Sequence, residues 1–150
     1  MDLTSDTYVV DASVVVKWFL TDEVLGRQAL TVWRTHLESE TVLAAPSHVI
    51  VEVSNAILSA SRYSPPRVGF ETARDMIADL TEISISTVPV SELVIPAFEL
   101  SHEFDTSLYD SLYLALSQVT SATLITADRR FHEKILHDHD VLWLGDIEPL

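Results

Sequence analysis

The sequence contains no cysteine and little glycine or proline: 3 Gly and 6 Pro stand among its 150 residues. The lack of cysteine excludes disulfides and thiolate metal sites, and it is typical of proteins from a reducing compartment. The low glycine and proline counts argue against a low-complexity or disordered chain. We therefore expect a folded, cytoplasmic protein.

Long hydrophobic runs are also missing. The apolar stretches are short and interrupted by charged residues, so none is long enough to cross a bilayer. The N-terminal segment MDLTSDTYVV has no basic region followed by an apolar run, which a signal peptide would need. These features predict a protein with no membrane contact.

Basic residues are scarce. The chain has 9 Lys and Arg against 23 Asp and Glu, and its net charge is -14. This balance argues against a nucleic-acid-binding protein, because phosphate binding normally requires a basic surface. Two explanations would reconcile it with such a function: several acids are metal ligands, or a basic partner covers part of the surface. Otherwise the charge belongs to an ordinary soluble acidic protein.

The residues that are present suit one compact domain covering residues 1–150, because the hydrophobic fraction is 47%. Short apolar runs alternate with segments of helical periodicity, which predicts an α/β fold with a central parallel sheet of four to five strands flanked by helices. We predict strands at about 7–11, 41–46, 83–88, 122–128 and 141–144, and helices at about 14–20, 24–38, 48–61, 67–81, 91–102, 106–119 and 128–136, with Ser47 and Ser91 as helix starts.

Two acids follow predicted strands directly. Asp11 ends the first strand and Asp128 ends the strand LITAD. Ligands of open parallel sheets bind beyond the carboxyl ends of the strands, so both acids are expected at the same edge. Each acid also precedes a helix, and N-capping alone would explain it. Two such acids at one edge of the sheet favour a binding site more strongly than either acid would alone.

Two further acids lie in apolar helical segments. Glu52 stands in HVIVEVSNAIL and Asp110 in SLYDSLYLALSQ. A carboxylate is costly to bury without a partner, and Asp is a poor residue for a helix interior. The alternatives are an exposed face for Glu52 and a first-turn position for Asp110, where the helix dipole favours an acid.

If the four acids converge, they need a cation. Two carboxylates about 4 Å apart repel by roughly 4 kcal/mol at an effective dielectric constant of about 20. Such a cluster either protonates in part or binds metal, and an all-oxygen site suits Mg²⁺ or Mn²⁺. These metals polarise phosphates and activate water, so the cluster predicts phosphodiester hydrolysis.

Four blocks of the sequence resemble the PIN domain, and within it the VapC-type toxins of toxin–antitoxin pairs. They run in order over nearly the whole chain: YVVDASVVVKWFL, APSHVIVEVSNAIL, YDSLYLALSQ and LITADRRF. Each block alone is a weak signal, and four in order make a strong one.

The resemblance implies a parallel sheet with converging acids and Mg²⁺- or Mn²⁺-dependent cleavage of RNA. The residues that match the acidic motif positions, and would bind metal, are Asp11, Glu52, Asp110 and Asp128. Ser13 and Thr126 match polar positions beside the acids, where they would support the ligands or water. The resemblance also implies a homodimer and a small antitoxin that places a basic side chain near the acids. A strongly acidic toxin would suit such a partner.

Few basic residues are candidates for binding roles. Arg129 and Arg130 follow the fourth acid and are candidates for RNA contact, as is Arg62; Lys134 and Arg67 are expected to be surface charges. The HDHD segment at 137–140 is expected to form a polar turn, and His48 to be structural or at the site's rim, because no second histidine-rich element supports a zinc site. The three tryptophans are expected in the core or in dimer contacts: Trp18, Trp33 and Trp143.

Two other functions remain open. An acidic phosphatase or phosphotransfer domain of receiver type also gathers carboxylates at strand ends, but two of these acids lie on helices, which fits that class poorly. A catalytically inactive PIN-fold binding module would keep the fold, yet the full set of four acids argues against a decayed site.

Overall fold

The computed structural model describes residues 7–38 and 41–150, and its centre is a five-stranded parallel sheet. The strand order is β3-β2-β1-β4-β5, and every neighbouring pair is parallel. The strands are β1 (Thr7–Val10), β2 (Val42–Pro46), β3 (Ser86–Val88), β4 (Thr123–Thr126) and β5 (Val141–Trp143). The predicted α/β fold with a parallel sheet is confirmed. Residues 1–6, in which no signal peptide was expected, lie outside the described part.

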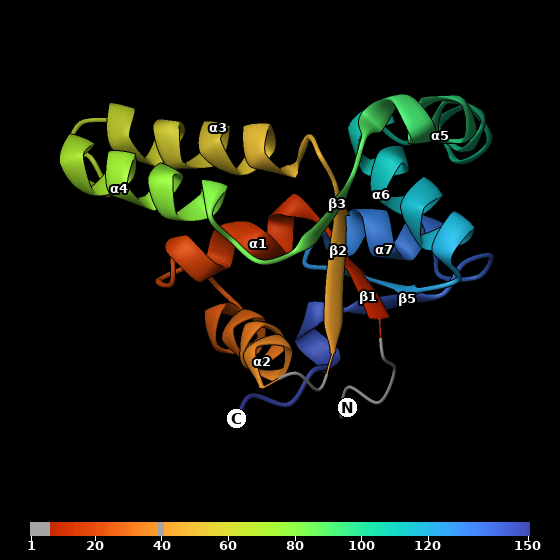
Figure 1. Cartoon of the computed structure of the whole chain (residues 1–150), viewed down its shortest axis with the longest axis horizontal. Coiled ribbons are helices and arrows are strands. Elements are labelled where there is room, and N and C mark those ends of the chain that lie inside the picture. The colour runs from red at the N-terminus through yellow and green to blue at the C-terminus, as the bar shows by residue number, and fades with distance from the viewer. Residues whose placement is uncertain (1–6, 39–40) are drawn as a thin grey trace.

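Seven helices flank the sheet in the described chain: α1 (Ala12–Phe19), α2 (Gly26–Leu37), α3 (Val49–Arg62), α4 (Phe70–Thr81), α5 (Val90–Phe104), α6 (Leu108–Thr120) and α7 (Arg129–Ile135). A short 3-10 helix, η1 (Leu144–Asp146), follows β5. Figure 1 shows α1 to α4 on one side of the sheet and α5 to α7 on the other, with α3 and α4 projecting as an arm. None of the described helices is both long and apolar enough to span a membrane.

The hydrophobic core explains why the central strands read as continuous apolar runs. Val9, Val10, Leu124 and Ile125 are completely buried because both faces of β1 and β4 are covered by helices. Every residue of α6 from 111 to 117 is also buried, since the helix packs between the sheet and α5. The apolar sequence that follows Asp110 is therefore core sequence.

The carboxyl ends of the strands form the upper edge of the sheet in Figure 1. The chain leaves β1 towards α1 on one face and leaves β4 towards α7 on the other, so the connections diverge between two adjacent strands. Divergence of this kind opens a crevice at the strand ends, where open α/β sheets bind their ligands. Asp11 and Asp128 follow these two strands.

Several predicted boundaries were wrong by a few residues. Ser47 does not cap α3: its Oγ accepts a hydrogen bond from the backbone N–H of Val90 at 3.3 Å, and His48 takes the cap position. Helix α5 begins at Val90 instead of Ser91, with Pro89 before it. Helix α4 starts at Phe70 instead of 67, because the N–H of Arg67 bonds back to the α3 carbonyl of Ala60 at 3.0 Å.

Candidate active site

Asp11 is a buried carboxylate at the exit of β1. Only 4% of its surface is exposed, and its Oδ1 accepts hydrogen bonds from Ser13 Oγ at 2.5 Å and from the N–H of Val14 at 3.3 Å. Burial raises the pKa of Asp11 to about 7, against the lowering effect of the bonds from Ser13 and Thr126. The residue thus caps α1, as the simpler reading expected, but capping does not offset the cost of burial.

Ser13 and Thr126 connect the turn after β1 to the turn after β4. Ser13 Oγ accepts a hydrogen bond from the N–H of Ala127 at 2.8 Å and lies 3.5 Å from Thr126 Oγ1. Thr126 Oγ1 in turn accepts a bond from the N–H of Asp128 at 3.0 Å. The two hydroxyls therefore fix the relative position of the two strand-terminal acids.

Asp128 is exposed and caps α7. Its Oδ1 accepts a hydrogen bond from the N–H of Phe131 at 3.0 Å, which leaves the rest of the carboxylate facing solvent. The predicted strand over 122–128 ends at Thr126, because the Thr126 hydroxyl bonds to the Asp128 amide and turns the chain. The side chain is placed at the rim of the crevice.

Glu52 lies in the first turn of α3 and is held by two side chains. Tyr113 OH donates a hydrogen bond to Glu52 Oε2 at 2.5 Å, and His48 Nε2 lies 3.2 Å from the same oxygen. Burial alone would raise the pKa of Glu52, but the contacts with His48 and Tyr113 outweigh it and hold the pKa below its ordinary value. Glu52 is therefore an ionised, oriented carboxylate whose Oε1 is left for another ligand.

Asp110 is half-buried in the first turn of α6. Burial raises its pKa, and the negative charges of Asp128 and Glu52 raise it further, against a lowering hydrogen bond from Ser107. The charge of Asp110 also raises the pKa of Asp11. Asp110 thus interacts electrostatically with each of the three other acids, and the gathering of all four into one site stays a prediction.

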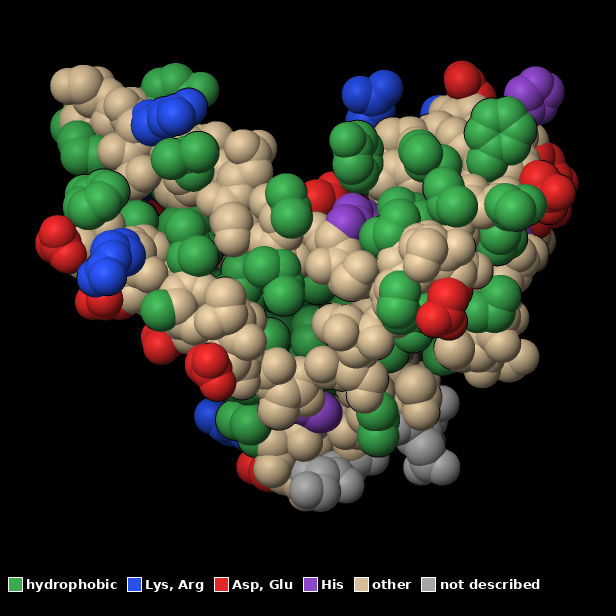
Figure 2. All heavy atoms as spheres, turned by 45° about the horizontal axis from the view of Figure 1, so that its top comes forward, with side chains coloured by type: hydrophobic (Ala, Val, Ile, Leu, Met, Phe, Trp, Pro, Cys, Tyr) green, Lys and Arg blue, Asp and Glu red, His purple; other side chains and the backbone are tan. Residues whose placement is uncertain are grey.

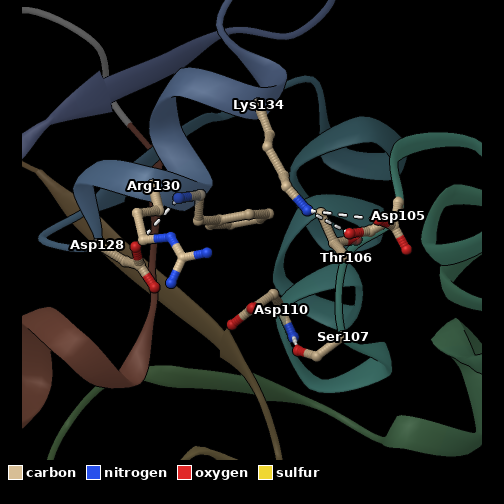
Figure 3. Close-up of a pocket in the computed structure, with 8 residues that line it drawn as sticks. Asp105, Thr106, Ser107, Asp110, Asp128, Arg130 and Lys134 are labelled. Carbon is tan, nitrogen blue, oxygen red and sulfur yellow. Dashed lines mark hydrogen bonds and ion pairs between the residues drawn. The ribbon is translucent and has the colours of Figure 1, made fainter.

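A pocket of about 170 Å³ opens beside these acids. It is lined by residues of the α5–α6 turn, α6, the β4–α7 turn and α7, namely Asp105, Thr106, Ser107, Asp110, Asp128, Arg130, Phe131 and Lys134. Figure 3 shows the carboxylates of Asp110 and Asp128 on one side of it. Figure 2 shows a notch between the α3–α4 arm and the α5–α6 side, with acidic and histidine side chains at its base.

The basic residues are distributed differently from the prediction. Arg130 lines the pocket, and so does Lys134, which was expected to be a plain surface charge. Arg129 instead pairs with Glu133 at 3.1 Å and lies over the Trp143 ring, 4.1 Å from its centroid.

The remaining candidates lie outside the pocket. Arg62 ends α3 ten residues after Glu52, which places it about 15 Å away along the helix. Arg67 pairs with Asp22 at 3.0 Å, as a surface charge would.

The segment 137–140 lies in the turn region after α7. Trp18 packs on Trp33 with ring centroids 4.8 Å apart.

Tyr113 makes a contact that the sequence does not predict. The helical pattern places it in the apolar surface of α6, and it is 1% exposed as expected for core. Its hydroxyl nevertheless reaches across to α3. Tyr113 lies three residues after Asp110 and therefore on the same face of α6, which is the one sequence feature that points to a place near the acids.

The chemistry of these side chains suits a hard divalent cation. All four acids offer oxygen ligands, and burial and mutual repulsion raise the pKa of Asp11 and Asp110, so that a cation would relieve a cost already present. As they stand, no three His, Asp or Glu side chains of the described chain lie close enough to hold a metal ion. Binding therefore requires side-chain rotation, which the exposure of Asp128 permits.

Comparisons with known proteins agree with this architecture. The family model of the PIN domain matches residues 8–135. A protein from Pyrobaculum aerophilum, PAE2754, has a similar structure, with a TM-score of 0.66, 21% identity, and coverage of 93% of this chain and 92% of that one. VapC20 of Mycobacterium tuberculosis, described as a Sarcin-Ricin loop cleaving toxin, gives a TM-score of 0.64 at 18% identity over 84% and 93% of the two chains.

A toxin–antitoxin complex from Klebsiella pneumoniae gives a TM-score of 0.57 at 14% identity, covering 92% and 96%. At these identities the structural likeness speaks for the fold alone. No curated protein sequence matches the chain.

Proposed function

Since the chain belongs to the PIN domain family, we propose that it is a divalent-metal-dependent ribonuclease that hydrolyses RNA phosphodiester bonds, and the toxin of a toxin–antitoxin pair. The observation that carries the proposal is the position of the four acids: Asp11 and Asp128 follow the neighbouring strands β1 and β4, and Glu52 and Asp110 lie in the first turns of α3 and α6. The effect of Asp110 on Asp11, and of Asp128 and Glu52 on Asp110, supports their proximity. The similarity to VapC20, described as a Sarcin-Ricin loop cleaving toxin, is consistent with a cleaving toxin. The proposal assigns this activity to one domain, residues 1–150, acting in the cytoplasm.

In the proposed mechanism, the four acids would hold Mg²⁺ or Mn²⁺. When bound, such an ion polarises the phosphate and makes a bound water more acidic. Water adds to phosphorus, the ester P–O bond breaks, and a proton passes to the departing oxygen. Tyr113 and His48 orient Glu52, while Ser13 holds Asp11. No covalent intermediate with the protein is needed.

The partners follow the same proposal. We propose a homodimer and a small antitoxin that brings a basic segment to the acidic site. The net charge of -14 supports this pairing, because opposite charges steer association. The similarity to a toxin–antitoxin complex from Klebsiella pneumoniae is consistent with it.

The test is cleavage of labelled RNA by the purified chain, with Mg²⁺, with Mn²⁺ and with EDTA. We expect cleavage only with metal, and a loss of at least a hundredfold in Asp11→Asn, because the substitution removes a charged ligand. Cleavage by the Asp11→Asn preparation at the wild-type rate would reject the mechanism and point to a contaminating nuclease. Mass increase with a phosphodonor would instead indicate a phosphotransfer domain, and metal binding without cleavage an inactive module.

A further inference from the structure

Helix α7 presents two cations to the same pocket as the acids. Arg130 and Lys134 are four residues apart, so they lie on one face of the helix, and both line the pocket beside Asp110 and Asp128. The whole chain has only 9 Lys and Arg against 23 acids. Two cations beside the candidate acids therefore form a local exception to the charge of the molecule.

The guanidinium of Arg130 is free to bind a ligand. Within the described part of the chain this guanidinium makes no hydrogen bond or ion pair, although Asp110 and Asp128 line the same pocket. Figure 3 shows it extending into the pocket between the Asp128 and Asp110 side chains. A guanidinium offers a planar fork of donors that matches a phosphate in a bidentate arrangement.

The ammonium of Lys134 is fixed at the opposite wall. Its Nζ donates a hydrogen bond to the backbone carbonyl of Asp105 and lies 4.0 Å from Asp105 Oδ2, which is fully exposed and therefore a weak partner. Figure 3 shows the side chain reaching across the pocket to this turn. An ammonium has three donors, so hydrogen-bonding capacity remains.

The turn that Lys134 contacts is itself well defined. Ser101 Oγ donates to the Thr106 carbonyl at 2.6 Å, and Thr106 Oγ1 lies 2.6 Å from Ser111 Oγ. Ser107 caps α6 by accepting a bond from the Asp110 N–H at 3.0 Å. These contacts order the turn that joins the Lys134 hydrogen bond to the first turn of α6, where Asp110 lies.

We infer that Arg130 and Lys134 bind the phosphate of the nucleotide adjacent to the scissile bond. The inference rests on the proposed function: if the acids act on the scissile phosphate, the α7 side of the pocket is where a neighbouring phosphate of the same strand would lie. A volume of about 170 Å³ suits one phosphate group and its immediate surroundings. A net charge of -14 disfavours a broad backbone footprint, so affinity must come from a few local contacts.

The first experiment compares Arg130→Gln and Lys134→Gln with Arg34→Gln, an exposed arginine on α2 that does not line the pocket. Each α7 variant should raise KM for a short single-stranded RNA about tenfold with kcat within about twofold, since a charged hydrogen bond is lost outside the reacting bond. Each should also reduce the slope of log KM against log salt by about 0.7, the value for one single-strand phosphate contact. Lys134→Arg should restore most of the affinity, and Arg34→Gln should match wild type.

The second experiment replaces the charged phosphate next to the scissile bond with a neutral methylphosphonate. Wild type should lose affinity for this RNA, and the double variant Arg130→Gln/Lys134→Gln should lose nothing further, because both contacts are already gone. If wild type cleaves RNA and the α7 variants keep its KM and salt slope, the inference is wrong and the proposed function stands. If wild type neither binds nor cleaves RNA, as read by fluorescence anisotropy and gel assay, both are rejected.

Discussion

At the scale of single residues, Asp11 is the costliest side chain of the site. It is 4% exposed, and burial raises its pKa from 3.8 to about 7. Between these two values the folded chain keeps a proton that the unfolded chain releases. The unfolding free energy attributable to Asp11 therefore falls as pH rises through this window and is constant above it.

We predict that Asp11→Asn removes this pH dependence. Without metal, the variant should be more stable than wild type at about pH 8, by a few kcal/mol, and the difference should shrink towards about pH 3, where Asp11 is mostly protonated in both states. Urea unfolding in EDTA across this range measures it. Added Mg²⁺ should stabilise wild type and leave Asp11→Asn almost unchanged. A stability difference independent of pH would show that Asp11 is not the titrating group.

At the scale of elements, Tyr113 joins α6 to α3 at the site. Its hydroxyl bonds to Glu52 Oε2 at 2.5 Å from a position that is 1% exposed, so the bond depends on how the two helices pack. The Tyr113 ring packs in the core, whereas its hydroxyl contacts the candidate site. Removing the hydroxyl alone therefore separates its effect on the site from the effect of the ring on core packing.

We predict that Tyr113→Phe weakens Mg²⁺ binding about tenfold, because Glu52 loses the group that orients it. The ring still fills its space, so the unfolding free energy should fall by only about 1–3 kcal/mol. Calorimetric titration with Mg²⁺ gives the affinity directly. Tyr109→Phe, one turn earlier on α6 and 62% exposed, is the matched control and should bind Mg²⁺ as wild type does. Equal affinity in both variants would exclude a positioning role for Tyr113.

The same scale separates what the sequence predicts from what it does not. Period and turn residues predicted all five strands and seven helices of the described chain, because each has its own local signal. The prediction of Ser47 as a helix cap was wrong, because its hydroxyl accepts a hydrogen bond from the backbone N–H of Val90, which is distant in sequence. The roles of Tyr113 and Lys134 depend on contacts between helices far apart in sequence, which no local pattern encodes.

At the scale of the whole molecule, one exposed face remains apolar. On α5, Ile95 is 71% exposed and Phe98 is 65% exposed, with Val94 beside them at 36%. Figure 2 shows hydrophobic side chains gathered over this side of the molecule. Contiguous apolar surface on a chain that is otherwise strongly charged favours association.

We predict that the proposed homodimer uses this face. The chain should elute as a dimer in gel filtration with light scattering, and the double variant Ile95→Ser/Phe98→Ser should shift it towards monomer. Val24→Ser removes an apolar side chain that is even more exposed, at 82%, and lies outside α5, so it should leave the dimer intact. A wild-type chain that is monomeric at all concentrations, or equal dissociation by the Val24 variant, would reject the assignment.

The strand order has a consequence for biosynthesis. Asp11 follows the first strand and Asp128 the fourth, yet β1 and β4 are neighbours, so the two acids meet only when a long stretch of chain has closed. A ribosome adds residues in order, and a nascent chain that ends before residue 128 lacks one of the four acids. The proposed four-acid site would therefore be complete only late in the synthesis of the chain, after the segment that carries Asp128 has left the ribosome.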